Sequence, residues 1–127
     1  DFKRYSEGPA RVVLVARLGL LARAYEKARY CYVGGAFHHR VHNTAEPAAL
    51  GVPVLTGPQI EASPIALQLE SEGTLFRRAS GAEIFATLDD LEKDEKRRLL
   101  LSQKSRRYML SQRGASEVFL DAFRVGQ

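Results

Sequence analysis

One stretch, residues 30–58, constrains the fold of this chain more than any other. It opens with a short apolar run, Tyr30–Val33, which Gly34 and Gly35 bring to an end. A run of this length bounded by glycines predicts a buried parallel strand. Glycines at its end let the backbone turn sharply and pass close to a ligand.

The residues after the two glycines predict a turn from strand to helix. A polar loop, residues 37–43, leads into a short helix, residues 44–50, which Gly51 ends as a C-terminal glycine. A second strand follows at residues 52–55. Doubly wound folds build anion and nucleotide sites from elements in this order: a strand, a glycine turn, a polar loop and the N-terminus of a helix.

The rest of the chain continues this alternation of strands and helices. Residues 11–16 are predicted to form a strand covered on both faces, because Val12, Val13, Leu14 and Val15 follow one another without alternating polar residues. Residues 2–7 suggest a strand remnant and turn. We further expect a strand at 74–77 and helices at 20–28, 65–72 and 82–91. Pro64 would lie in the first turn of the helix at 65–72, and Ser80 or Gly81 would precede the helix at 82–91. This order predicts an α/β fold, a Rossmann-like parallel sheet with helices on both faces.

Helical spacing also predicts which side chains are buried. In the helix at 20–28 they are Leu18, Leu21, Ala24, Tyr25 and Ala28, and in the helix at 82–91 they are Ile84, Phe85 and Leu88.

The C-terminal part is distinguished by its charge. Residues 93–113 hold eight Lys or Arg and two acids, a balance of +6, whereas the whole chain carries +4. The pattern predicts one long basic helix over 94–113 and a final helix over 115–123. We therefore divide the chain into residues 1–92, a partial nucleotide-binding domain, and residues 93–127, helices that pack back on it. The basic helix is interpreted as a solvated face, with an anionic membrane surface as the alternative. Basic clusters can also bind nucleic acid, but no nucleic-acid partner is predicted, because Tyr108 is the only aromatic residue of this segment and no base-reading motif is present.

Length and composition set further bounds. With 127 residues, the chain is long enough for one domain with a single core. Its single cysteine, Cys31, excludes an internal disulfide and predicts a buried, inert thiol. Residues 1–9 include no initiator Met and resemble the middle of a fold, so we expect a fragment or an excised domain.

The residues of the central stretch resemble one family, the 3-deoxy-D-manno-octulosonic acid (Kdo) transferases, in their C-terminal, donor-binding half. The family pattern runs Phe-Val-Gly-Gly-Ser, a variable loop, Gly-His-Asn-x-x-Glu-Pro-Ala-Ala-x-Gly-x-Pro-Val-x-x-Gly-Pro. Here the matching residues are Tyr32-Val33-Gly34-Gly35-Ala36, then His42-Asn43-Thr44-Ala45-Glu46-Pro47-Ala48-Ala49-Leu50-Gly51-Val52-Pro53-Val54, then Gly57-Pro58.

The resemblance implies a function. These two-domain enzymes, with two Rossmann-like halves, move Kdo from CMP-Kdo onto a lipid A precursor at the cytoplasmic face of the Gram-negative inner membrane, without a metal cofactor. Their acceptor site, catalytic base and membrane anchor belong to the N-terminal domain. No catalytic residue is therefore assigned in this chain, which is expected to be inactive alone. The resemblance implies that the donor nucleotide-sugar is bound by Gly34, Gly35, His42, Asn43, Thr44 and Glu46.

Two of these residues have a second interpretation. Asn43 or Thr44 is the expected N-cap, and Glu46 stands where the glutamate of a capping box would stand. Spacing alone leaves open whether Glu46 accepts hydrogen bonds from ribose hydroxyls or from the helix start. The resemblance favours the ribose.

Three histidines, His38, His39 and His42, fall within five residues. Metal binding is disfavoured, because structural zinc takes four ligands and this loop offers neither cysteine nor carboxylate.

The chain departs from the family at two places. Ala36 replaces a hydroxyl-bearing residue, which removes one hydrogen-bond donor. The family's Asp-Thr-x-Gly-Glu-Leu becomes Ala16-Arg17-Leu18-Gly19-Leu20-Leu21, so both acids are missing. This loss favours an alternative, a catalytically lost nucleotide-binding or scaffolding module of the same fold.

Overall fold

A parallel sheet of three strands forms the centre of the computed structural model, which describes residues 2–4, 12–15 and 19–112. The strands β3 (Cys31–Val33), β4 (Val54–Thr56) and β5 (Leu75–Arg77) lie side by side in chain order. Val33, Thr56 and Arg77 are aligned across the sheet, so the carboxyl ends of all three strands share one edge. Parallel strands joined through helices confirm the predicted α/β class.

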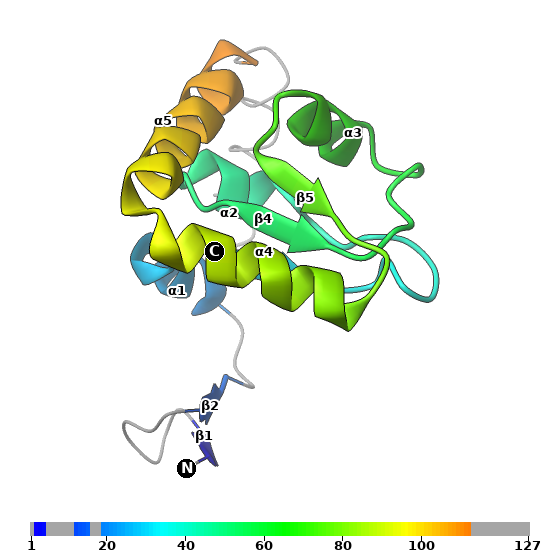
Figure 1. Cartoon of the computed structure of the whole chain (residues 1–127), viewed down its shortest axis with the longest axis vertical. Helices are drawn as coiled ribbons and strands as arrows, with labels where there is room; N and C mark the ends of the chain where they lie inside the picture. The colour runs from blue at the N-terminus through cyan, green and yellow to red at the C-terminus, as the bar shows by residue number, and fades with distance from the viewer. Residues whose placement is uncertain (1, 5–11, 16–18, 113–127) are drawn as a thin grey trace.

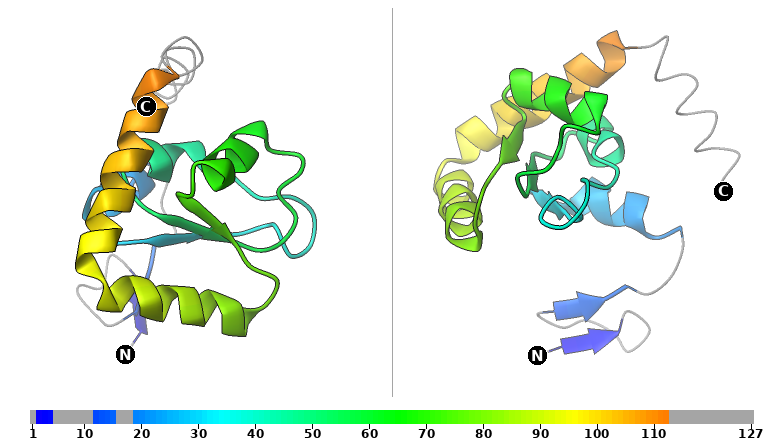
Figure 2. Two further views of the ribbon diagram at one scale, coloured as in Figure 1. Left: turned by 45° about the horizontal axis from the view of Figure 1, so that its top comes forward. Right: turned by 90° about the vertical axis from the view of Figure 1, so that its right-hand side faces the viewer.

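Helices cover both faces of this sheet (Figures 1 and 2). The crossover helices α2 (Ala45–Ala49) and α3 (Pro64–Ser71) pack on one face, over Val54 and Leu75. Helix α4 (Gly81–Lys93) covers the other face, over Leu55 and Phe76. The long helix α5 (Glu95–Ser111) packs against both α2 and α4 and contributes Leu101 to one core and Met109 to the other.

Several helix ends lie where the sequence predicts them. Pro64 is the first residue of α3, behind the N-cap Ser63, whose hydroxyl accepts from the Ala66 N–H at 3.2 Å. Ser80 caps α4 in the same way, and Asp94 caps α5. Gly51 and Gly73 follow helices with φ of +77° and +80°, the left-handed conformation that glycine tolerates best.

The N-terminal strands differ from the prediction. β1 (Phe2–Arg4) and β2 (Val12–Leu14) form a separate parallel pair, which stands apart from the main body in Figures 1 and 2. All of Val12–Val15 is exposed, so the prediction of a strand covered on both faces was wrong. The reason is that no described helix packs against this pair, and an apolar run cannot show by itself whether its covering layers are present.

Two predicted buried faces also need correction. In α1 (Leu21–Lys27), Leu21 and Ala24 are exposed, whereas Tyr25 and Ala28 are half-buried, because α1 lies at the margin and packs mainly on α2. Leu18 lies outside the described residues. Phe85 in α4 is 74% exposed.

The buried line of α4 runs through its other apolar residues. Ile84 and Leu88 pack against the core as predicted, and Thr87 and Leu91 are buried on the same face. Phe85 points elsewhere because neighbouring helical residues differ by about 100° in direction. The predicted helix over residues 115–123 lies outside the described part of the chain.

Candidate functional site

The two glycines after β3 form a tight turn against His42. Gly35 has φ of +98°, and a Cβ atom there would collide with the Arg40 carbonyl oxygen and lie 2.9 Å from Cδ2 of His42. The His42 N–H donates to the Gly34 carbonyl at 2.9 Å. The structure therefore brings Gly34, Gly35 and His42 together, and only glycine fits at position 35.

Backbone hydrogen bonds fix the loop between these residues. The N–H groups of His38 and His39 donate to the Gly35 carbonyl at 3.2 and 3.0 Å. Gln59, after β4, donates its N–H to the Ala36 carbonyl at 2.9 Å and accepts from the Val41 N–H at 3.2 Å. The loop is thus joined to the segment that leaves the neighbouring strand.

The start of α2 is capped by Asn43. Its Oδ1 accepts from the Ala45 N–H at 2.9 Å, whereas Thr44, the residue at the N-cap position, makes no side-chain cap bond. Thr44 is completely buried, and its hydroxyl oxygen has no hydrogen-bond partner within the described residues. Of the six residues predicted to bind the donor, Thr44 is the one that is buried, while His42 and Asn43 are exposed.

Glu46, in the first turn of α2, is half-buried, and its carboxylate accepts no hydrogen bond from the described part of the chain. In a capping box the Asn43 N–H would donate to the Glu46 carboxylate, and this hydrogen bond is not formed within the described residues. Burial raises the pKa of the Glu46 carboxyl above its usual value. The pKa of neighbouring Tyr25 is raised to about 12, chiefly by burial, then by Cys31 and by Glu46.

Backbone donors at the start of α2 are fewer than the sequence suggested. Asn43 occupies the Ala45 N–H, and Pro47 has none. Among the first three residues of α2, only Glu46 keeps an N–H without an acceptor in the described ranges. The first three residues of α2 therefore offer one free amide, and an anion there would need further donors.

The opposite end of α2 is closed by α5. The buried hydroxyl of Ser105 donates to the Ala48 carbonyl at 2.9 Å, and the Arg106 guanidinium donates twice to the Leu50 carbonyl, at 3.2 and 3.0 Å. Sequence reasoning missed both residues, because they stand more than 50 positions from their acceptors and belong to no local motif.

Cys31, in β3, is half-buried, and desolvation raises the pKa of its thiol to about 12. The thiol is therefore less buried than predicted, and its raised pKa disfavours the reactive thiolate. No group of three or more His, Cys, Asp or Glu within residues 2–4, 12–15 and 19–112 is arranged to hold a metal ion. No helix in those ranges combines the length and apolarity needed to cross a membrane.

Comparison with known proteins supports the resemblance found in the sequence. No protein-family model matches the chain. Two curated proteins named 3-deoxy-D-manno-octulosonic acid transferase are similar, from Aquifex aeolicus (33% identity over 97 residues, 75% of this chain) and Chlamydophila psittaci (39% over 64 residues, 48% of this chain). The matches span 27% and 15% of those proteins, so this chain corresponds to a small part of their length.

A solved structure shares the fold. It is the C-terminal CMP-Kdo binding domain of WaaA from Acinetobacter baumannii, with a TM-score of 0.75 and 21% identity. The match covers 86% of this chain and 60% of that domain. The fold is thus that of the C-terminal half of these two-domain enzymes, and the chain is a distant homologue of the Kdo transferases.

Proposed function

We propose that this chain holds the donor nucleotide of a glycosyltransferase that moves Kdo from CMP-Kdo to a lipid A precursor, at the cytoplasmic face of the Gram-negative inner membrane. The curated relatives carry the transferase name, and the structural relative is named for CMP-Kdo binding. Acceptor binding and the catalytic base are assigned to the part of those enzymes that this chain does not match.

In this proposal the glycine turn and His42 meet the phosphate of the donor. Transfer of the sugar breaks its bond to that phosphate, so negative charge develops on the departing CMP. Hydrogen-bond donors already in place stabilise such a charge. His42 is exposed beside Gly34 and Gly35, and the Glu46 N–H has no other partner in the described chain, so both are available to donate.

Glu46 is the observation that carries the proposal. Its carboxylate is half-buried and accepts no hydrogen bond from the described part of the chain, and its oxygens are not buried from solvent, so they are available to a ligand. The two hydroxyls of a ribose are suitable donors for it. Asn43 already caps the helix, so the capping-box interpretation leaves Glu46 without a function.

Titration with CMP tests this assignment. Glu46→Gln keeps the size of the side chain but removes the charged acceptor, and hydrogen bonds to charged groups contribute about 1.5–3 kcal/mol. CMP affinity should fall roughly tenfold or more, as measured by calorimetry on wild type and variant. Equal affinities would exclude the ribose role. Asp89→Asn in α4, which removes an exposed carboxylate of a surface ion pair, is the matched control and should leave CMP affinity unchanged.

A second candidate is a nucleotide-binding or scaffolding module without transferase activity. It is favoured by Leu20, which stands where the family has glutamate and makes no side-chain cap bond at the start of α1. The other missing acid, at Ala16, lies outside the described residues. A transferase assay on the full-length protein with CMP-Kdo and a lipid A precursor decides between the two. Binding without turnover would identify the module, and turnover would exclude it.

A further inference from the structure

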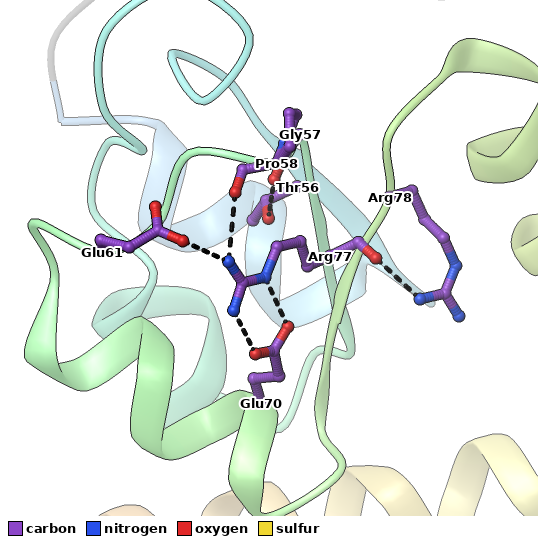
Figure 3. A network of polar contacts seen from close by, with 7 residues as sticks. All are labelled: Thr56, Gly57, Pro58, Glu61, Glu70, Arg77 and Arg78. Atoms are coloured by element: carbon purple, nitrogen blue, oxygen red, sulfur yellow. Dashed lines mark hydrogen bonds and ion pairs between the residues drawn. The ribbon is translucent and has the colours of Figure 1, made fainter.

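Arg77, the last residue of β5, joins three segments at the carboxyl edge of the sheet (Figure 3). Its Nε and Nη2 donate to the two carboxylate oxygens of Glu70 in α3, at 2.8 and 2.6 Å. Its Nη1 donates to Glu61 at 2.5 Å and to the Pro58 carbonyl at 3.3 Å. Four hydrogen bonds leave this guanidinium little capacity to bind a ligand anion, so its contribution is to hold the protein together.

The segment that Arg77 holds is the one that supports the glycine loop. Pro58 and Glu61 lie on either side of Gln59, whose backbone makes the two hydrogen bonds to Ala36 and Val41. Next to it, Gly57 lies so close to the Phe37 ring that a Cβ atom would be 2.7 Å from it. Contacts therefore run without a break from Arg77, through residues 57–61, to the loop that carries Gly35 and His42.

The geometry and burial of the Arg77–Glu70 ion pair favour a strong interaction. The planar guanidinium meets the Glu70 carboxylate with two parallel bonds, a geometry that lysine cannot reproduce. The side chains of Arg77 and Glu70 are 29% and 33% exposed, so water weakens this pair less than a surface ion pair. The Arg77 hydrogen bond also holds the pKa of the Glu70 carboxyl below its usual value. The ion pair between Arg77 and Glu61 is weaker, because the Glu61 side chain is 70% exposed to water.

We propose that Arg77 is a positioning residue for the glycine loop: by fixing residues 57–61 against α3, it holds Gly35 and His42 in a ligand-ready arrangement without touching the ligand. The effect on the loop stands by itself, whereas the effect on binding rests on the proposed function. The chain offers a matched comparison in Arg29, another arginine that pairs with a glutamate, at 2.9 Å from Glu92, in contacts that do not involve the glycine loop.

Backbone hydrogen exchange, measured by NMR on Arg77→Gln and Arg29→Gln, tests the loop directly. The Val41 and Gln59 amides should exchange about tenfold faster in Arg77→Gln, while the Val54 amide inside the sheet changes little. Arg29→Gln should leave all three as in wild type. Equal acceleration of all three amides in Arg77→Gln would show a general loss of stability and overturn the proposal, as would unchanged exchange.

Two further variants keep the test decisive. Arg77→Lys retains the charge but not the paired bonds, and should give an intermediate effect on exchange. Glu61→Ala removes only the hydrogen bond from Arg77 to the exposed Glu61 carboxylate, so it should fold normally and loosen Gln59 and Val41 less than Arg77→Gln does. If Arg77→Gln does not fold, wild-type exchange at Gln59 and Val41 in both of these variants would overturn the proposal.

CMP titration of the same variants separates this inference from the proposed function. We expect CMP affinity to fall severalfold in Arg77→Gln and to remain at the wild-type level in Arg29→Gln. Faster loop exchange with unchanged CMP affinity would overturn the positioning role. If wild type itself does not bind CMP, the proposed function fails, and the exchange data alone still decide whether Arg77 holds the loop.

Discussion

The two ends of α2 are built in opposite ways. Its C-terminal carbonyls are occupied by side chains of α5, with Ser105 on Ala48 and Arg106 on Leu50. Its N-terminal end has one cap, from Asn43, and leaves Glu46 without a partner in the described chain. A helix of five residues cannot be stable by itself. We infer that the closed end supplies the stability, whereas the open end leaves Glu46 available, as the proposed function requires.

The largest effect is expected from crowding the closed end. A Cβ atom on Gly51 would collide with Nε of Arg106 and lie 2.7 Å from Oγ of Ser102, and the residue also has a left-handed φ. Strain and overpacking together predict that Gly51→Ala lowers the free energy of unfolding by about 2–4 kcal/mol. Thermal and urea melts provide the measurement.

Gly73→Ala separates the two causes. Gly73 has nearly the same φ, +80°, but nothing lies within 4 Å of its would-be Cβ atom. Only the backbone strain of about 1 kcal/mol should remain there. Equal losses at Gly51 and Gly73 would mean that contact with α5 adds nothing, and the closed end would not be the stable one.

A smaller loss is expected from Ser105→Ala. The variant removes a buried hydrogen bond to Ala48, although that carbonyl keeps a second bond from the Gly51 N–H at 3.0 Å. The loss should therefore be about 1–2 kcal/mol in chemical denaturation. Ser111→Ala in the same helix removes an exposed hydroxyl that donates to the Tyr108 carbonyl, and should cost almost nothing. A reversed order would contradict the comparison.

These two ends also show what the sequence can predict and what it cannot. The turn at Gly51 and a strand within residues 30–33 follow from local rules about φ and apolar runs, and the sequence predicted both. It left the cap open between Asn43 and Thr44, and the structure selects Asn43. The prediction that the strand is buried was wrong at Tyr32, which is 47% exposed. Ser105 and Arg77 were missed, because their function depends on partners that only the folded chain brings near.

The errors have the same origin. Phe85 and the valines of β2 are apolar residues at positions that a regular pattern marks as buried, yet they are exposed. Whether such a face is covered depends on the neighbouring layer, which the local pattern does not contain. The six residues predicted to bind the donor were named through a resemblance, and local patterns did not show that His42 and Asn43 are exposed while Thr44 is buried.

At the open end, Asn43→Ala should cost about 0.5–1 kcal/mol, the usual loss when an exposed N-cap is removed. Asn43→Asp keeps an oxygen that can accept from the Ala45 N–H, and should retain most of that stability. Melts of both variants provide the measurement. If Asn43→Ala costs more than Ser105→Ala, the open end is a main support of the helix rather than a site left free.

The smallest effect on stability, and the one that separates the two ends most clearly, is expected from Glu46→Gln. Two influences act on this carboxylate: the helix start favours its charge, and burial disfavours it. Its pKa is raised, so burial is the stronger. The folded state therefore binds this proton more tightly than the unfolded state does. The stability from Glu46 is present at low pH and is lost as pH rises through the interval between its unfolded and folded pKa values.

Gln resembles the protonated acid, so Glu46→Gln should match wild type below that interval and be slightly more stable above it. Saturating CMP should reverse the order at neutral pH, because ribose hydroxyls would stabilise the charged carboxylate and raise the melting temperature of wild type more than that of the variant. Melts across pH, with and without CMP, measure both effects. A wild type that is more stable than Glu46→Gln at neutral pH without CMP would mean that Glu46 already supports the fold, and that this end of α2 is not open.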